Sequence, residues 1–268
     1  MKKLLIGLLA ITCQQVMAAS SPSAVKHLAS LDIALPAMID ISATHPVFDF
    51  DGDGCLPSAG IGRDGQMNSG LKTSGSLGGD CRESDFLKTS NTLHRYACKT
   101  VEQDEFCAHS YALYFMKDQV VSGADAFGHR HDWEHTMVWT KNGIMTHGAY
   151  SSHGDMFTKP TAELPVNAAG NLKIVYHKDG GLTHALRFAK ANEIAENPYG
   201  DFVLPPLTSW FSLTGDTLSN QEMRDKLNTY NYGSATIPSK DNNFVGTLNT
   251  NRPAGYPQYT QQDIEVSQ

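Results

Sequence analysis

The octapeptide at residues 128–135, GHRHDWEH, constrains the fold and the function of this chain more than any other segment. It places three histidines, two carboxylates, an arginine and a tryptophan in eight consecutive positions. Polar and charged groups are costly to bury without partners, so a cluster of this kind needs a common ligand or extensive pairing. We therefore interpret the octapeptide as a binding site, most simply for a divalent metal ion.

The first 18 residues have the pattern of an export signal. Lys2 and Lys3 precede an apolar run at residues 4–11, and the segment ends in the small residue Ala18. The apolar run is too short to span a membrane as a retained helix. We predict that residues 1–18 are a cleaved signal peptide and that the mature protein is secreted, extracellular, and a soluble monomer before any membrane contact.

The charge balance excludes one class of partner. The chain has 21 Lys and Arg against 28 Asp and Glu, a formal net charge of −7, and removing the signal peptide takes away two lysines and no acid. Nucleic acids and anionic membrane surfaces attract basic proteins. We expect no nucleic-acid partner, and any membrane binding has to come from specific recognition.

Four cysteines remain after the signal segment. An even number in an exported chain favours two disulfides. Three pairings are open, and the simplest joins neighbours along the chain, Cys55–Cys81 and Cys98–Cys107. The close paired spacing of a zinc site is absent.

Apolar runs bounded by turn residues indicate a mainly β (α+β) fold. The hairpin turn Lys141-Asn142-Gly143 and the capping box of Ser219 and Glu222, which opens a helix running to about Asn228, are the sharpest local signals. Strands are predicted at residues 111–115, 135–139, 144–146, 172–177 and 183–188, and further helices at 21–35 and 189–196.

These elements predict a central β-sandwich flanked by helices. No repeat or long linker divides the chain, so we expect residues 19–252 to form a single domain. Residues 48–107 are rich in Gly, Ser, Asp and Asn and predict a loop region tied by disulfides. Residues 253–268 predict a polar, frayed C-terminal tail.

Alternation along an extended chain assigns the faces of the octapeptide. In a strand at residues 132–140, Asp132 and Glu134 point to one face, and Trp133 and His135 point to the other, mostly apolar face. His129 has the wrong parity to join the two carboxylates, so the chain has to turn before Asp132. A glycine at position 128 permits such a turn.

A third carboxylate, Asp118, ends the strand-like segment before this site. Together with His129, Asp132 and Glu134 it forms a set of three oxygen donors and one nitrogen. This set suits Mg²⁺, Ca²⁺ or Mn²⁺ better than a closed zinc site. Coordination positions left open suit vicinal sugar hydroxyls, and a nearby Arg130 offsets the excess negative charge.

Several motifs resemble those of the necrosis- and ethylene-inducing-like proteins, a family of secreted cytolysins from plant-associated microbes. GHRHDWE is their heptapeptide, and the similarity extends over most of residues 45–245. It includes YALYF-MKDQ before the heptapeptide, SHG at 152–154, VYHKDGGLTHALRFA at 175–189, LTSW at 207–210 and YGSATIPSKDNNF at 232–244.

The resemblance implies a fold, a ligand set and an activity. The family has a β-sandwich flanked by helices, similar to actinoporins and some fungal lectins. It holds a divalent cation, Mg²⁺ or Ca²⁺, by residues that correspond here to Asp118, His129, Asp132 and Glu134. Its members bind sugar headgroups of glycosylinositol phosphorylceramide sphingolipids in the outer leaflet of the host plasma membrane and damage that membrane, which implies binding rather than catalysis here.

The loop before the octapeptide offers an alternative to this ligand set. The loop between Asp118 and Gly128 is about three residues longer than in the common two-cysteine members, and it carries Asp125 as an alternative ligand. Arg130, His131, His153 and Trp210 are further candidates for the headgroup site or its surroundings. For His131 a core histidine, and for Trp210 a core tryptophan, is the simpler interpretation.

A second acidic motif, DFDGDGC, places Asp49, Asp51 and Asp53 at alternating positions before a cysteine. The spacing resembles the start of a calcium loop, although the twelfth position, Gly60, excludes an EF-hand. From spacing alone, a solvated acidic turn explains the motif equally well. The resemblance favours a second Ca²⁺ site, because one four-cysteine subgroup of the family has a second disulfide and an additional calcium loop.

Two other functions remain open. A metal-dependent hydrolase is one, although HExxH and GxSxG are absent from the sequence. A lectin-like protein that binds sugar without lysis is the other. Leakage from vesicles that contain the plant sphingolipid separates the three interpretations.

Overall fold

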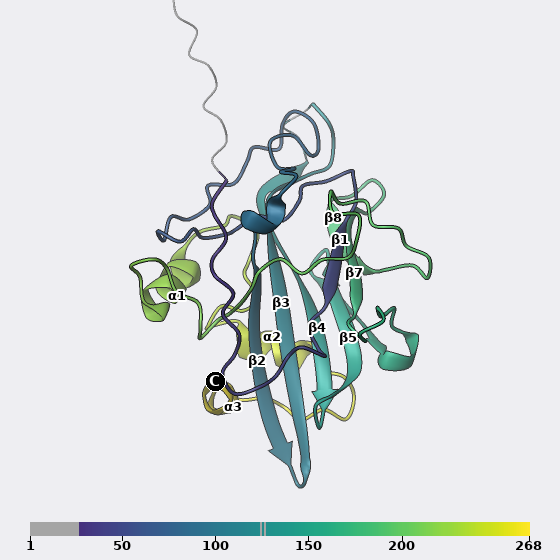
Figure 1. The fold of residues 1–268 in the computed structure, drawn as a ribbon, viewed down its shortest axis with the longest axis vertical. Coiled ribbons are helices and arrows are strands. Elements are labelled where there is room, and N and C mark those ends of the chain that lie inside the picture. The colour runs from purple at the N-terminus through teal and green to yellow at the C-terminus, as the bar shows by residue number, and fades with distance from the viewer. Residues whose placement is uncertain (1–26, 124, 126) are drawn as a thin grey trace, which may run out of the picture.

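Two β-sheets packed face to face form the centre of the computed structural model, which describes residues 27–123, 125 and 127–268 (Figure 1). The larger sheet has six strands in the order β6-β5-β4-β3-β2-β9, and the smaller has three in the order β1-β7-β8. The predicted sandwich is therefore correct. The predicted signal peptide, residues 1–18, lies outside the described residues.

The strands of the six-stranded sheet range from three residues in β9 to 16 in β3. They are β2 (Thr92–Val101), β3 (Asp104–Gln119), β4 (Gly128–Lys141), β5 (Ile144–Ser152), β6 (Asp155–Pro160) and β9 (Leu207–Ser209). β2 to β6 form an antiparallel meander, and β9 pairs parallel with β2. The predicted turn at Asn142 and Gly143 joins β4 to β5, with both residues at positive φ, as a tight hairpin requires.

The smaller sheet covers one face of the larger one. It consists of β1 (Val47–Phe50), β7 (Lys173–Lys178) and β8 (His184–Phe188). Phe50 and Tyr176 from this sheet pack on Phe115 of β3, and Tyr176 stacks on Phe115 with ring centroids 3.7 Å apart. This apolar contact holds the two sheets together at the end where the octapeptide lies.

Helices cover the opposite face of the larger sheet. They are α1 (Asn220–Thr229), α2 (Phe244–Asn251) and α3 (Gln261–Ser267), with short 3-10 turns at Phe86–Lys88 and Thr161–Glu163. Phe244 and Leu248 of α2 pack with Met137 and Trp139 of β4 in a second core, and α2 accordingly lies behind the strands in Figure 1. The capping box predicted for Ser219 and Glu222 is present at the start of α1. Among the described residues, no helix is long and apolar enough to cross a membrane.

Both predicted disulfides are present. Cys55–Cys81 closes a loop of the segment after β1, and Cys98–Cys107 joins directly opposed residues of β2 and β3. The region predicted as loops, residues 48–107, is less irregular than expected, because β1, β2 and the start of β3 occupy its two ends.

Three predicted features are wrong. Residues 27–35, part of a predicted helix, are extended: Ala34 forms backbone hydrogen bonds to Leu207 and Ser209, and Pro36 disfavours helical geometry just before it. Residues 189–196 form turns, because Arg187 binds Glu193 through two hydrogen bonds.

The frayed C-terminal tail is the third prediction that is wrong. Its last residues fold into α3, which starts with a capping box of Thr260 and Asp263 and buries Ile264 against the second core. Tyr259 is buried as well, with 2% of its surface exposed. Ile264 and Tyr259 lie on the covered side although Val266 is exposed, so two apolar residues are enough to hold this mostly polar segment in place.

Candidate metal site

The pairing of β3 with β4 brings three of the four predicted ligands together. Asp118 lies directly opposite His129 in the antiparallel register, and Asp118 Oδ2 is 3.9 Å from His129 Nε2. One ligand atom from each of Asp118, His129 and Asp132 lies within 4.8 Å of the other two. Glu134 follows Asp132 along β4 but stands outside this closest group.

A left-handed residue inside β4 makes the convergence possible. His131 has φ +63°, a conformation that reverses the alternation of side chains between His129 and Asp132. The turn that parity requires is therefore located at His131. The ring is held in place because its Nδ1 lies 2.6 Å from the hydroxyl of Tyr114.

Gly128 lets the start of β4 lie close to the end of β3. Its φ is +109°, and a Cβ at this position would collide with the backbone carbonyl of Asp118. Any larger residue would push β4 away from the Asp118 end of β3, so the first residue of the octapeptide sets the close approach of the two strands.

The orientation of His129 suits a metal ligand. Its Nδ1 donates a hydrogen bond to the backbone carbonyl of His131 at 2.7 Å. A carbonyl only accepts, so Nδ1 carries the proton and Nε2 on the Asp118 side keeps its lone pair whenever the ring is neutral. A backbone carbonyl that fixes the tautomer in this way is typical of metal-bound histidines.

Asp118 is held in place by His184, a residue that the sequence did not indicate as part of the site. The carboxylate accepts hydrogen bonds from the His184 backbone N–H and from His184 Nδ1 at 2.7 Å. Burial lowers the pKa of His184, but the hydrogen bonds and charges of Asp118 and Asp53 outweigh burial and raise it to about 9. His184 therefore carries a positive charge beside the cluster at neutral pH. The only signal in the sequence was its place in the motif THALRFA at the start of a strand.

Asp132 and Glu134 are almost fully buried, with 5% and 8% of their surfaces exposed. Asp132 accepts a hydrogen bond from the Tyr176 hydroxyl at 3.1 Å, and Glu134 accepts one from the Ser151 hydroxyl. Burial, followed by repulsion from neighbouring carboxylates, raises the pKa of both groups. The pocket thus concentrates more negative charge than its protein partners neutralise, which is the electrostatic setting that a divalent cation fits.

Three predicted contributors lie away from the cluster. Arg130 is exposed and donates to the Ser69 carbonyl, so it does not neutralise the carboxylates; His184 provides the nearby positive charge. Asp125 is exposed and accepts a hydrogen bond from Thr73, so Asp118 rather than Asp125 completes the group. Trp210 is completely buried and donates to Asp241, which makes it a core residue and excludes contact with a sugar or a membrane.

The carboxylates of the second acidic motif do not converge. Asp49 is fully buried and accepts hydrogen bonds from the backbone N–H groups of Glu196 and Asn197, while Asp51 faces Arg187 at 3.5 Å. Asp53 lies 3.7 Å from His184. Each carboxylate has a separate protein partner, and no group of metal ligands among the described residues includes the three together. The second calcium site at Asp49, Asp51 and Asp53 stays a prediction that this arrangement of their side chains does not support.

The cluster opens into a polar cavity of about 410 Å³. His153, from the turn between β5 and β6, lies at this cavity and is held by Asp179 at 3.0 Å and by Thr183 at 3.2 Å. Both partners come from the segment between β7 and β8. The polar lining and the partly exposed His153 leave room for a small polar ligand next to the cluster.

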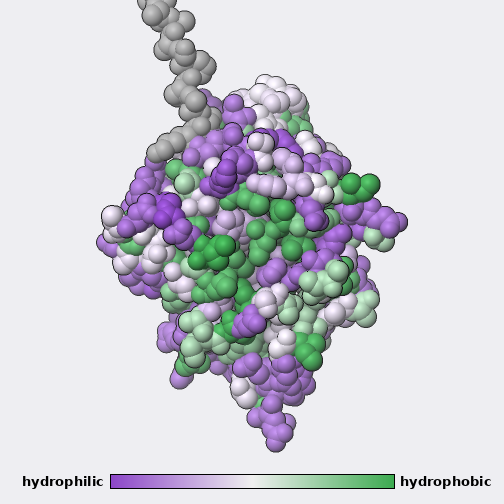
Figure 2. Space-filling model, in the orientation of Figure 1, coloured by the Kyte–Doolittle hydropathy of each residue, from purple (hydrophilic) through white to green (hydrophobic). Residues whose placement is uncertain are grey.

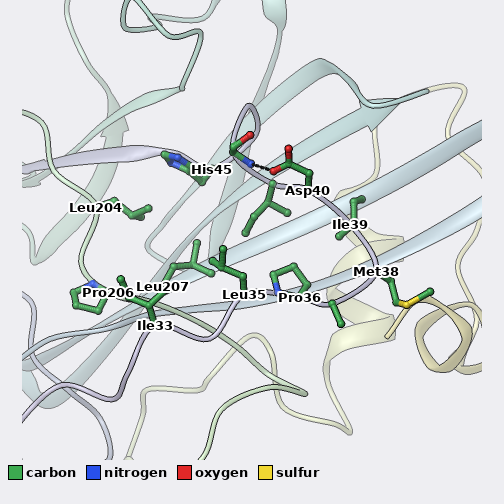
Figure 3. Close-up of a pocket in the computed structure, with 13 residues that line it drawn as sticks. Ile33, Leu35, Pro36, Met38, Ile39, Asp40, His45, Leu204, Pro206 and Leu207 are labelled. Carbon is green, nitrogen blue, oxygen red and sulfur yellow. Dashed lines mark hydrogen bonds between the residues drawn. The ribbon is translucent and has the colours of Figure 1, made fainter.

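A larger cavity, about 630 Å³, lies elsewhere, between residues 33–42 and 204–207 (Figure 3). On the face seen in Figure 2, hydrophobic side chains gather where the N-terminal segment crosses the sheet. Ile33, Leu35 and Met38 are exposed there. The single carboxylate at this cavity, Asp40, accepts a hydrogen bond from the backbone N–H of Ser42, so the cavity lacks the clustered ligands of the metal site.

Comparison with known proteins identifies the family. The model of the family described as "Necrosis inducing protein (NPP1)" matches residues 41–251. The chain belongs to this family. It is 28% identical to NLP effector protein 2 of Phytophthora capsici, over 73% of this chain and 72% of that protein. It is 30% identical to NLP effector protein 2 of Plasmopara viticola, over 73% of this chain and 79% of that protein.

Solved structures of similar proteins share the fold. NLPPya in complex with mannosamine superposes with a TM-score of 0.62 at 25% identity, over 81% of this chain and 93% of that one. HaNLP3, described as a non-toxic protein, superposes with a TM-score of 0.63 at 24% identity, over 84% of this chain and 98% of that one. The relatives from Phytophthora capsici and Plasmopara viticola are named as effectors rather than by a reaction. Because a non-toxic protein has the same fold, the fold alone does not decide toxicity.

Proposed function

We propose that this chain is a secreted cytolysin that binds the sugar headgroup of a plant membrane sphingolipid through a divalent cation and then permeabilises the membrane. The observation that carries the proposal is the convergence of Asp118, His129 and Asp132 at a polar cavity. NLPPya, a protein of the same fold, has been crystallised with mannosamine and with glucosamine, which supports an amino sugar as part of the ligand.

The cation would be held by Asp118, His129 and Asp132, with Glu134 adding negative charge beside them. These donors, oxygens with one imidazole nitrogen, suit Mg²⁺ or Ca²⁺. When bound, the cation would offer coordination to sugar hydroxyls. The chain's own part is to fix the donors: His184 holds Asp118, Tyr176 holds Asp132, and the His131 carbonyl orients His129.

The charge of the protein supports a specific headgroup over a general membrane affinity. The chain is acidic, and its pocket is lined by carboxylates, so anionic lipid surfaces repel it. The partner we propose is glycosylinositol phosphorylceramide in the outer leaflet of the plant plasma membrane, recognised by its terminal sugar. The terminal sugar lies at the far end of the headgroup from the lipid phosphate, which lessens this repulsion.

Dye release from vesicles tests the proposal. Vesicles containing glycosylinositol phosphorylceramide should leak in the presence of Mg²⁺ or Ca²⁺, whereas vesicles without this lipid or with a chelator should remain intact. The variant Asp132→Asn should lose leakage, and Asp225→Asn, which changes an exposed acid on α1, should retain it. Metal-dependent binding without leakage would identify a non-lytic lectin, and leakage independent of the lipid would contradict the proposal.

A further inference from the structure

The cavity beside the metal cluster has a second end that the metal ligands do not reach. β5 pairs with β4 only from Thr136 onward, so the strand is open to one side before that residue. One cavity therefore borders both Glu134 and His135, which point to opposite faces of β4. On the His135 side the cavity is bounded by residues 234–236 and by Thr247 and Asn251 of α2.

The chemistry of the lining changes from one end to the other. The metal end carries Asp118, Asp132 and Glu134, whereas the α2 end carries hydroxyl and amide groups. Asp155 is the one acid of this cavity outside the cluster, and it is exposed at the turn between β5 and β6. A cavity end with neutral donors and acceptors suits a neutral, polyhydroxylated group better than a charged one.

Several of these polar groups have no partner within the described part of the chain. Ser234 and Thr236 are exposed and form no side-chain hydrogen bonds there, so their hydroxyls are open to a ligand from solvent. Asn251 uses its Nδ2 to reach the Thr247 carbonyl at 2.8 Å, and its Oδ1 is left to accept. His135 Nε2 is shielded from solvent and unpaired among the described residues. A ligand hydroxyl that pairs with this shielded His135 nitrogen would remove the penalty of leaving it unpaired.

The same end has apolar surface for the ring of a sugar. Trp133 and Met156 line the cavity together with the His135 ring. Aromatic or apolar faces combined with a few polar groups are the usual composition of small-molecule sites. The combination differs from the apolar cavity near Leu35, where a single carboxylate, already hydrogen-bonded to its own loop, is the only acid.

We propose that this α2 end, lined by Ser234, Thr236, Asn251 and His135, is a second saccharide subsite that binds the sugar unit next to the one at the metal. The inference rests on the proposed function, because it assigns the neighbouring part of the same headgroup. The protein would thereby distinguish headgroups by their second sugar and its linkage, and not only by the terminal sugar.

Calorimetry with short sugars tests the subsite. Glucosamine and a panel of glucosaminyl-hexose disaccharides, which carry glucosamine at the terminal position in 1→2, 1→3, 1→4 and 1→6 linkages, are titrated into the Mg²⁺-loaded wild type. At least one disaccharide should bind about tenfold more tightly than glucosamine. The double variant Ser234→Ala/Thr236→Val should lose most of that gain while its affinities for Mg²⁺ and glucosamine stay within twofold. Thr217→Val, which removes an exposed hydroxyl outside the cavity, is the matched control.

The outcomes separate the two proposals. If glucosamine binds only with Mg²⁺ but no disaccharide binds more tightly, the subsite is wrong and the metal-dependent sugar site stands. The subsite is equally wrong if the double variant, folded by circular dichroism, keeps the full disaccharide gain or loses glucosamine to the same extent. If the wild type binds neither monosaccharide nor disaccharide with metal present, both proposals are overturned.

Discussion

Two acidic clusters of this protein have similar spacing of carboxylates in the sequence but different surroundings in the structure. In the octapeptide cluster, Asp132 and Glu134 are buried near Asp118 with hydroxyl partners, and the charged His184 lies beside Asp118. In the segment at residues 49–53, each carboxylate turns to a different partner, and Asp51 faces Arg187, which also binds Glu193. The second cluster has an arginine partner, although burial and repulsion from Glu196, Asp53 and Asp49 still raise the pKa of Asp51 to about 6.

The comparison shows what turns an acidic motif into a candidate cation site. Close spacing of carboxylates is common to both motifs. What differs is the geometry: ligand atoms of Asp118, His129 and Asp132 converge on one point, whereas Asp49, Asp51 and Asp53 face separate protein partners and Asp51 is paired with Arg187. The following predictions test this distinction, from the largest expected effect to the smallest.

Neutralising one carboxylate in each cluster should separate them most clearly. Asp132→Asn should weaken Mg²⁺ binding about 1000-fold, since it removes one ligand and one charge, whereas Asp51→Asn should change it by no more than about threefold. Isothermal titration with Mg²⁺ measures both. Comparable losses in the two variants would contradict the distinction.

Removing the cation of the second cluster should destabilise the fold. Arg187→Ala leaves Asp51 and Glu193 half-buried without their partner, and we expect a loss of about 3 kcal/mol in the free energy of unfolding. Urea denaturation measures the change. Arg130→Ala, at an exposed arginine bonded to one backbone carbonyl, should stay within about 0.5 kcal/mol. A stable Arg187→Ala protein would show that the second cluster does not depend on pairing.

His184 links the two clusters, and its charge should appear in the pH dependence of the metal-free protein. Its pKa is raised to about 9 in the fold, so its stabilising contribution is complete below the ordinary histidine value and is lost as the pH rises through 9. We expect metal-free wild type to lose roughly 2 kcal/mol of stability between pH 6.5 and 9.5. His184→Gln should lack this decline. An equal decline in the variant would assign it to other groups.

Protons should compete with the cation at the first cluster. The raised pKa values of Asp132 and Glu134 mean that these groups take up protons above the range of ordinary carboxyls. Mg²⁺ affinity should therefore fall as the pH decreases, by about tenfold between pH 7.5 and 5.5. Titrations at several pH values measure it. An affinity that stays constant down to pH 4.5 would show that the carboxylates are ionised as in solution.

Local patterns predicted the elements whose own residues decide their structure. The hairpin at Asn142 and the capping box at Ser219 depend on contacts within a few residues, and both are present. The predicted helices at residues 21–35 and 189–196 had the correct periodicity, but partners far along the chain decide those segments. Ala34 pairs with β9, and the backbone at residue 196 donates to Asp49.

For the candidate site, too, the sequence predicted only the features that neighbouring residues decide. Alternation indicated that Asp132 and Glu134 share a face and that the chain must turn after His129. The positive φ of His131 and the contact of His184 with Asp118 were not predictable, because 66 residues separate the latter pair in the sequence. Trp210 and Arg130 were misplaced for a related reason: a side chain's burial depends on which distant elements cover it.

By itself, the sequence determined which chemistry is available: the strand periodicity, the turn residues, the cysteines and the donors of the octapeptide, all of which act over short distances. Only the tertiary structure decided which acids remain without a cation. That outcome depends on where β8 and the segment after it place His184, Arg187 and Glu193 relative to strands formed far earlier in the chain. Electrostatic pairing acts through space, and the order of residues along the chain does not record those distances.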